Sequence, residues 1–321
     1  MHMSTLYLDH KNSRIKCRRH TLQVSQEGQS RPRSYPLSLL NHLVIVQNAE
    51  MDAATLATLA SHGISVALLS GRRELHAAFL TGRPGNDARR RLMQYTARQD
   101  PDLRRRIVAH LLRAKLAGQY RLISRLLRHR PDQRRILTRA GKTLRENQRQ
   151  ITSRTAPVDV LRGLEGSASA ATFSALSAVL PPVFGFKHRQ RRPPPDPVNA
   201  LLSLSYTLAH GLALRECLAA GLDPAIGYLH DPQHDRASLA LDLIEPQRPI
   251  IEYRIWHLLR KRRLDTHHFT QSGDACLLNK EGRQRFYPWW ESHTPAMTRL
   301  MRRHLHGQLA RVQGEIQGHA D

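Results

Sequence analysis

The 321-residue sequence contains little cysteine, few aromatic residues and no long apolar run. Its cysteines, Cys17, Cys217 and Cys276, are far apart and form no CxxC pair, which excludes a zinc ribbon and a disulfide framework and fits a reducing cytoplasm. Aromatic residues make up 5% of the chain, so stacking of bases on side-chain rings is not the expected way to bind a nucleic acid. With neither a signal peptide nor an apolar run that spans a bilayer, we expect a cytoplasmic protein with no membrane partner.

Acidic residues are also scarce relative to basic ones, with 26 Asp and Glu against 50 Lys and Arg and a formal net charge of +24. A charge excess of this size repels itself, and a polyanion is its natural partner. Contacts from arginine to phosphate groups are the expected source of affinity, and such contacts weaken as salt rises. The composition therefore favours a protein that binds nucleic acid.

The first part of the chain, residues 1–81, has the short alternating pattern of β-strands. Met51–His62 interrupts this pattern with helical spacing, an N-cap at Asp52 and Gly63 just past its end. The expected strands cover residues 5–9, 14–18, 21–25, 43–47, 65–69 and 75–80. Acids and histidines do not cluster in this region, so we expect a scaffold or dimerisation domain, followed by a Gly/Pro-rich linker at 82–86.

From residue 87 onward the apolar spacing becomes that of helices, which predicts an α+β protein with a small β-rich N-terminal domain and a larger all-α catalytic domain at 87–321. The expected helices cover 87–99, 102–128, 132–153, 158–180, 196–220, a stretch ending near 261, and 295–317, with a strand-like segment at 275–278. Their polar faces are rich in arginine, which is typical either of a solvated surface or of phosphate binding. The basic, proline-rich loop at 186–197 leaves the same two interpretations open for Arg189, Arg191 and Arg192.

The stretch Gly221–Arg248 concentrates ionisable residues that point to chemistry. His230 ends a short apolar run, and Asp242 and Glu245 lie three residues apart in an apolar segment, which places both carboxylates on one face of a helix. Glu165 lies upstream among leucines and glycines. Each of these residues alone is more often structural, as a surface acid or a core histidine. Together they form a mixed nitrogen and oxygen set that suits Mg²⁺ or Mn²⁺.

Four segments in this order, LRGLEG, NALLSLSYTLAHG, GLDPAIGYLH and SLALDLIEP, resemble the motifs of the integrase–endonuclease family of CRISPR adaptation. That family inserts new spacers into the CRISPR array, and the resemblance extends over essentially the whole chain. It implies that Glu165, His230 and Glu245 are the catalytic residues and hold Mg²⁺ or Mn²⁺. Asp242 matches a second acid of the family, which either replaces Glu245 as the third ligand or orients it. His210 stands where relatives often carry a tyrosine.

The resemblance also implies how such an enzyme meets its substrates. Arg248 matches the basic position after the metal ligands. Arg248 and Arg162 are expected to stabilise the scissile phosphate, and the alternative for each is an ordinary surface charge. The implied partners are double-stranded DNA, as prespacer and as CRISPR array, a second copy of the chain bound through the β domain, and a small ferredoxin-like adaptation protein. Two dimers bridged by one dimer of that protein would form a heterohexamer. Attack by a DNA 3′-hydroxyl gives strand transfer, and attack by water gives cleavage.

Two other functions fit parts of the sequence. A non-catalytic basic scaffold for DNA or RNA explains the charge but gives Glu165 no role. A helical metallohydrolase of small phosphoesters explains the acids and the histidine but leaves the net charge of +24 without a purpose.

Overall fold

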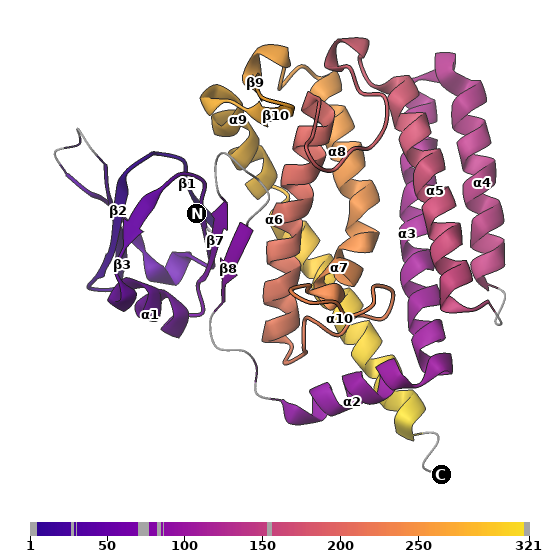
Figure 1. Ribbon diagram of the computed structural model, residues 1–321, viewed down its shortest axis with the longest axis horizontal. Coiled ribbons are helices and arrows are strands. Elements are labelled where there is room, and N and C mark those ends of the chain that lie inside the picture. The colour runs from indigo at the N-terminus through magenta and orange to yellow at the C-terminus, as the bar shows by residue number, and fades with distance from the viewer. Residues whose placement is uncertain are drawn as a thin grey trace. The chain divides into compact units, whose positions relative to one another are not determined.

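The computed structural model describes residues 5–26, 29, 31–69, 77–81, 85, 87–152 and 156–317 of the chain. The chain divides into two compact units (Figure 1). The first comprises Met1–Asn86 together with Tyr287–Glu291, and the second comprises Asp87–Phe286 and Ser292–Asp321. The first unit is rich in strands and the second is mainly helical, which confirms the α+β fold class expected from the sequence. The predicted linker at 82–86 lies, apart from Gly85, outside the described residues.

The first unit is built from two small sheets with strand orders β1-β5-β7-β8 and β4-β3-β2-β6. Its elements are β1 (Thr5–Leu8), β2 (Ser13–Arg18), β3 (Thr21–Ser25), β4 (Arg33–Pro36), β5 (His42–Ile45), β6 (Ala49–Met51), α1 (Ala53–Ser61), β7 (Ser65–Leu69) and β8 (Ala77–Leu80). Inward-facing side chains of both sheets and of α1, such as Leu22, Leu43 and Leu59, form one buried core. The predicted cap is present, since the Asp52 side chain accepts a hydrogen bond from the Thr55 amide at 2.7 Å.

Two strands of this unit were not predicted. β4 is an edge strand whose residues are exposed or half-buried, and β6 is a short strand of three residues that pairs in parallel with β2. β4 lacks the alternation of buried and exposed residues on which strand prediction depends, and the three residues of β6 are too few to establish one. Residues 75 and 76 of the last predicted strand lie outside the described residues.

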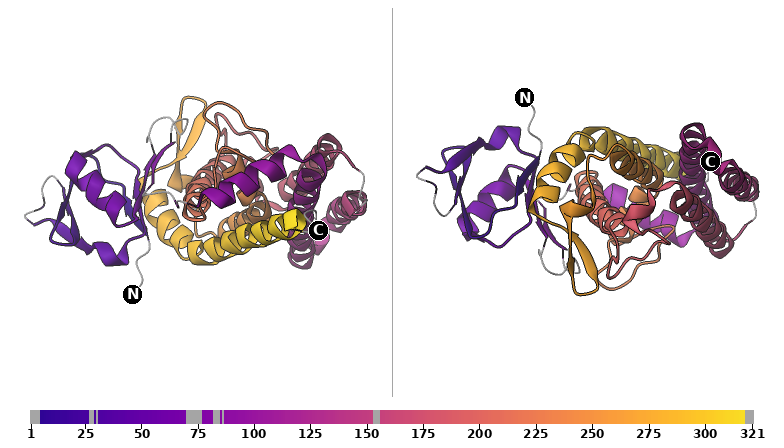
Figure 2. Two further views of the ribbon diagram at one scale, coloured as in Figure 1. Left: turned by 90° about the horizontal axis from the view of Figure 1, so that it is seen from below. Right: turned by 90° about the horizontal axis from the view of Figure 1, so that it is seen from above.

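The second unit consists mainly of helices, of which α3, α4 and α5 lie side by side (Figure 1). The helices are α2 (Ala88–Gln99), α3 (Pro101–His129), α4 (Arg134–Thr152), α5 (Val158–Val179), α6 (Pro197–Ala219), α7 (Ser238–Ile244), α8 (Arg248–Arg260), α9 (Lys280–Glu291) and α10 (Thr294–Gln317). The side chains of Asp87, Asp100 and Asp196 cap α2, α3 and α6. Figure 2 shows α10 running along this helical unit, where it packs against α6.

Between α8 and α9 the helical unit contains a hairpin of β9 (Phe269–Ser272) and β10 (Ala275–Leu278). The sequence predicted β10 but neither β9 nor α9. β9 is largely exposed, and α9 contains Gly282 and Pro288, which both lower helix propensity. A short 3₁₀ turn, η5 (Thr266–His268), leads into the hairpin.

A glycine allows α3 to approach the segment that carries Glu245. A Cβ placed on Gly118 would lie 3.2 Å from a carbon of Pro249, at the start of α8. The 3₁₀ turn η4 (Glu245–Gln247) precedes this proline and packs on α3. The close approach brings Lys115, one turn before Gly118, to the side of Glu245. Separately, none of the helices in the described part of the chain has both the length and the apolarity needed to cross a bilayer.

Candidate metal and nucleic-acid site

The centre of the site is the side chain of Lys115, which extends from α3 and is 2% exposed. Its ammonium group donates hydrogen bonds to Glu165 on α5 and to Glu245 at the start of η4. Two carboxylates that are 80 residues apart in sequence therefore meet at one buried positive charge. Glu245 is almost fully buried, whereas a quarter of the Glu165 side chain is exposed.

The charges in this cluster hold one another in the ionised state. Burial alone would lower the pKa of Lys115, but the nearby charges of Glu245 and Glu165 outweigh burial and raise it. Burial would likewise raise the pKa of Glu245, but Arg248, Lys115 and His230 lower it to about 2. Since His230 acts on the pKa of Glu245, its imidazole belongs to the same electrostatic cluster.

His230 is oriented by Asp242, which is 1% exposed. Asp242 accepts hydrogen bonds from the backbone amides of Tyr228, Leu229 and His230 at 2.6, 3.0 and 3.0 Å, and its Oδ1 lies 2.6 Å from His230 Nδ1. Both carboxylate oxygens are therefore engaged with the loop that carries the histidine. Because Nδ1 faces Asp242, the other ring nitrogen, Nε2, is left as the atom that can bind a ligand. A Cβ on Gly227 would overlap Ser238, so only glycine allows this tight loop.

Three arginines brace the residue that follows His230. Arg162 on α5 donates to the Leu229 carbonyl and to Asp231 Oδ2, the latter at 2.6 Å. Arg98 and Arg104 donate to Asp231 Oδ1 at 2.7 and 2.6 Å. Burial would raise the pKa of Asp231, but the hydrogen bond from Arg162 and the three positive charges lower it. Arg162 thus positions the loop that carries His230, a role that the sequence did not predict.

Arg248 also contacts Glu245. Its Nε donates to Glu245 Oε1 at 2.7 Å, and its guanidinium lies over the Tyr206 ring, 4.5 Å from the centroid. His210, one turn further along α6 than Tyr206, lies near Arg248. Burial and this charge lower the pKa of His210, while the Ala237 backbone opposes them. The Tyr206 phenol therefore lies beside the cluster, although His210 occupies the position where relatives often carry a tyrosine.

The three arginines of the proline-rich loop differ in their surroundings. Arg189 is half-buried and donates to the Asn199 side chain at 2.9 Å and to Ser203 at 3.1 Å. Arg191 and Arg192 are exposed. Asn199 also ties down this loop by binding the His188 carbonyl and the Gln190 amide. The loop therefore displays two of the three predicted arginines to solvent and uses the third to hold itself in place.

Sequence reasoning missed Lys115. Its neighbours Leu111, Leu112 and Leu116 are fully buried, so a lysine here interrupts the apolar face of a long helix. Lysine is almost never fully buried unless it is paired, so this interruption was a usable signal. The sequence alone did not identify the partners, which lie 50 and 130 residues away.

The geometry also tests whether one cation fits this set of residues. A single ammonium contacts both Glu165 and Glu245, so a single charge at this position reaches both carboxylates. Oxygen ligands with one imidazole nitrogen are typical of Mg²⁺ or Mn²⁺ sites. The two carboxylates therefore fit such an ion, provided that Lys115 yields the position. In the described part of the chain the ligand atoms of Glu165, His230 and Glu245 do not all lie within 4.8 Å of one another, so these side chains would have to move closer to hold one ion together.

The fold and this cluster indicate the class of the protein. It is an enzyme with a β-rich first unit and a helical second unit that carries acids and a histidine. The chain belongs to the CRISPR-associated Cas1 family, since the family described as CRISPR associated protein Cas1 matches residues 6–292. It is 31% identical over 318 residues to CRISPR-associated endonuclease Cas1 1 of Thermodesulfovibrio yellowstonii, with 98% of each chain covered. It is also 31% identical over 314 residues to CRISPR-associated endonuclease Cas1 3 of Thermus thermophilus, with 91% of each covered. The family resemblance found in the sequence, and with it the function of a CRISPR-associated endonuclease and integrase, is confirmed.

Solved structures share the fold. A Cas1 protein from Thermotoga maritima superposes with a TM-score of 0.81 at 22% identity, with 97% of both chains covered. A casposase bound to integration product superposes with a TM-score of 0.80 at 17% identity, covering 96% of this chain and 91% of that one. A Cas6-RT-Cas1–Cas2 complex gives a TM-score of 0.79 at 22% identity, covering 98% of this chain and 35% of that chain.

Proposed function

We propose that this Cas1-family enzyme uses one divalent cation, Mg²⁺ or Mn²⁺, held by Glu165, His230 and Glu245, to cleave and join DNA phosphodiesters. The observation that carries the proposal is the shared contact of Glu165 and Glu245 with one buried positive charge. When bound, a cation at this position activates the attacking oxygen and offsets the negative charge that grows on the phosphate. We call Glu165, His230 and Glu245, together with Lys115 between the two glutamates, the carboxylate site.

The residues around the carboxylate site divide into ligands and positioning groups. Glu245 is the third ligand, because both oxygens of Asp242 already bind the backbone and ring of the His230 loop. Asp242 holds the His230 ring so that Nε2 faces away from the carboxylate and is ready to bind. Arg162 holds the Leu229 carbonyl and Asp231, which fixes the same loop from its other side.

Lys115 and Arg248 neutralise the two glutamates in the absence of a metal ion. A divalent cation held by both carboxylates would take the place of the Lys115 ammonium, so Lys115 would have to release at least one of them. Its charge would then be available to a phosphate group. Lys115 and Arg248 are therefore placed to stabilise the scissile phosphate, with the nucleophile, a DNA 3′-hydroxyl or water, deciding between joining and cleavage.

The substrate and partners follow from the family and from the charge. A net charge of +24 and the exposed Arg191 and Arg192 support binding of double-stranded DNA, as prespacer and as CRISPR array. The likeness to a casposase bound to integration product and to a Cas6-RT-Cas1–Cas2 complex supports the same substrate class and a Cas2-type partner. We propose that the chain forms a homodimer through its β-rich unit. We further propose that two such dimers join one dimer of the small ferredoxin-like partner in a heterohexamer.

Strand joining tests the proposal. The purified chain, mixed with its partner protein and Mn²⁺, should insert a short duplex into a supercoiled plasmid, and rising salt should weaken the reaction. Glu165→Gln should reduce joining by roughly 100-fold or more, the scale expected when a group that stabilises transition-state charge is lost. Glu146→Gln, an exposed glutamate on α4, is the matched control and should retain activity. Unchanged joining by Glu165→Gln would contradict the role of Glu165, and absence of joining by the wild-type protein would favour the non-catalytic basic scaffold.

A further inference from the structure

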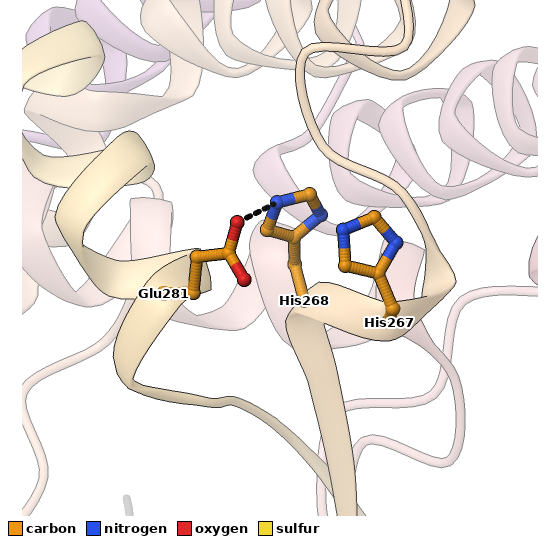
Figure 3. A group of neighbouring side chains, drawn as sticks. All are labelled: His267, His268 and Glu281. Atoms are coloured by element: carbon orange, nitrogen blue, oxygen red, sulfur yellow. Dashed lines mark ion pairs between the residues drawn. The ribbon is translucent and has the colours of Figure 1, made fainter.

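A second cluster of ligand-type side chains lies at the base of the β9–β10 hairpin (Figure 3). His267 and His268 end the turn η5 before β9, and Glu281 lies in the first turn of α9, after β10. One potential ligand atom from each of the three residues lies within 4.8 Å of the others, and in the described part of the chain no other group of acids, histidines or cysteines meets this criterion. We call these three residues the hairpin site.

One ring nitrogen of His268, Nε2, is buried without a hydrogen-bond partner. The residue is 1% exposed. The nearest acid oxygen, Glu281 Oε1, is 3.4 Å away, toward which Nε2 points in Figure 3. Buried polar atoms are nearly always satisfied, so a buried ring nitrogen that stops short of its acid calls for a further group. The His267 ring lies beside it, with 3.9 Å between the ring centroids.

The other nitrogen of His268, Nδ1, faces the backbone of Asp265. The Asp265 amide donates a hydrogen bond to Nδ1 at 2.9 Å, and the Asp265 carbonyl oxygen lies 3.2 Å from the same nitrogen. A metal ion on Nε2 would require the ring proton on Nδ1, where the Asp265 carbonyl can accept it in place of the contact with the amide. A metal-bound histidine almost always donates its other ring N–H to a carboxylate, a carbonyl or water.

The backbone around the hairpin site is fixed by independent contacts. Asn279 donates to the His267 carbonyl at 2.6 Å and accepts from the Gly282 amide at 2.9 Å, which ties η5 to the start of α9. A Cβ on Gly282 would overlap the His268 carbonyl oxygen, so only glycine lets the two segments approach this closely. The hairpin register, with Leu278 opposite Phe269, closes the same loop. The ligands are thus held together before any ion binds.

We propose that His267, His268 and Glu281 bind a borderline transition-metal ion, with Zn²⁺ the preferred ion. Two imidazole nitrogens and one carboxylate suit Zn²⁺ better than Mg²⁺, which favours oxygen ligands. Three protein ligands leave one position of a tetrahedral ion for water. The ion would join the turn η5 to the first turn of α9 and so act as a structural cross-link. Arg285 would compete with the ion for Glu281, because it donates a hydrogen bond to Glu281 Oε1 at 2.9 Å.

Zinc titration of the metal-free, full-length protein tests the proposal. With Mg²⁺ in excess to fill the carboxylate site, calorimetry should show one Zn²⁺ bound per chain and a higher midpoint of thermal unfolding. His267→Ala and Glu281→Gln change exposed side chains, and each should weaken Zn²⁺ binding by at least about 10-fold, the lower limit for removing even a supporting partner. Arg285→Gln should strengthen Zn²⁺ binding, because it frees the carboxylate and removes a nearby positive charge.

Matched controls separate this site from general binding by histidines. His306→Ala and Glu146→Gln remove an exposed histidine and an exposed, arginine-paired glutamate elsewhere, and both should bind Zn²⁺ like the wild type. Glu165→Gln should keep the Zn²⁺ while it loses Mn²⁺-dependent joining, so the two sites fail independently. Absence of Zn²⁺ binding, or equal losses of affinity in His267→Ala and His306→Ala, would overturn the proposal.

Discussion

The carboxylate site and the hairpin site differ in burial and in the number of acids that each contains. The carboxylate site is buried and rich in acid, and the chain supplies its own counter-charge in Lys115. The hairpin site is at the surface, and Arg285 competes for its single acid. Each site therefore includes a protein cation that an incoming metal ion has to displace.

Burial decides how much that displacement matters. Lys115 is 2% exposed and contacts two carboxylates. Arg285 contacts one carboxylate, and about half of its side chain is exposed. A buried pair that loses one partner leaves an uncompensated charge in a medium of low dielectric, while an exposed pair is screened by water. Without metal, the carboxylate site therefore depends on Lys115, with Arg248 as a second partner of Glu245. The hairpin site does not depend on Arg285 for stability.

The largest effect is expected from removing the internal cation. Lys115→Gln should lower the free energy of unfolding of the metal-free protein by about 3–5 kcal/mol, because Glu165 and Glu245 lose their shared partner. Mn²⁺ should then raise the unfolding midpoint more than in the wild type. Arg285→Gln and the exposed Lys142→Gln should leave stability nearly unchanged. Chemical denaturation with and without Mn²⁺ measures all three, and a neutral Lys115→Gln would break the comparison.

The pH dependence of stability sharpens the comparison. The pKa of Glu245 is lowered to about 2, so its ionised form stabilises the fold at neutral pH. This contribution, about 3 kcal/mol, is complete above the unfolded-state pKa near 4.5 and is lost as pH falls toward 2. In EDTA, the wild type should therefore lose more unfolding free energy between pH 4.5 and 2 than Glu245→Gln does. Parallel curves for the two proteins would contradict this assignment.

A smaller effect is expected at Asp242. Asp242→Asn keeps the shape but turns one acceptor into a donor that faces backbone N–H groups, at a cost of about 1–3 kcal/mol. Mn²⁺-dependent joining should fall by roughly 10- to 100-fold, as expected for a group that orients a metal-bound histidine. Mn²⁺ affinity measured beside activity distinguishes the roles. Complete loss of Mn²⁺ binding would make Asp242 a ligand in place of Glu245.

The smallest effect is expected on the exposed loop. The double change Arg191→Ala and Arg192→Ala should alter stability by no more than about 0.5 kcal/mol. It should reduce the slope of DNA affinity against salt by about 1 for each arginine that binds a phosphate group in the wild type. Arg14→Ala, an exposed arginine of the β-rich unit, is the control. An unchanged salt slope in the double variant would assign these arginines to the solvated surface.

The elements of the fold could be predicted where local pattern decides them. The alternation in β3 and the helical spacing of α2 and α6 are local features, and the structure has β3, β7, α2 and α6 at or within one residue of the expected bounds. The edge strand β4 escaped prediction, because pairing with a neighbour rather than its own residues makes it a strand.

The site residues were harder to interpret than the elements. The spacing of Asp242 and Glu245 predicted two acids on one helix face, but α7 ends at Ile244 and Glu245 begins a 3₁₀ turn. The two carboxylates therefore do different things, one binding the His230 loop and the other Lys115. Such a division depends on the path of a loop and on a lysine far away in the chain, neither of which spacing contains.

Mn²⁺ binding followed by electron paramagnetic resonance tests the central claim most directly, because it reports the ion itself rather than activity. We predict one Mn²⁺ per chain in the wild type, loss of this ion in Glu165→Gln and in His230→Ala, and its retention in Glu281→Gln. Binding of Mn²⁺ to Glu165→Gln with wild-type affinity, or its loss in Glu281→Gln, would contradict the assignment of the catalytic ion to Glu165, His230 and Glu245.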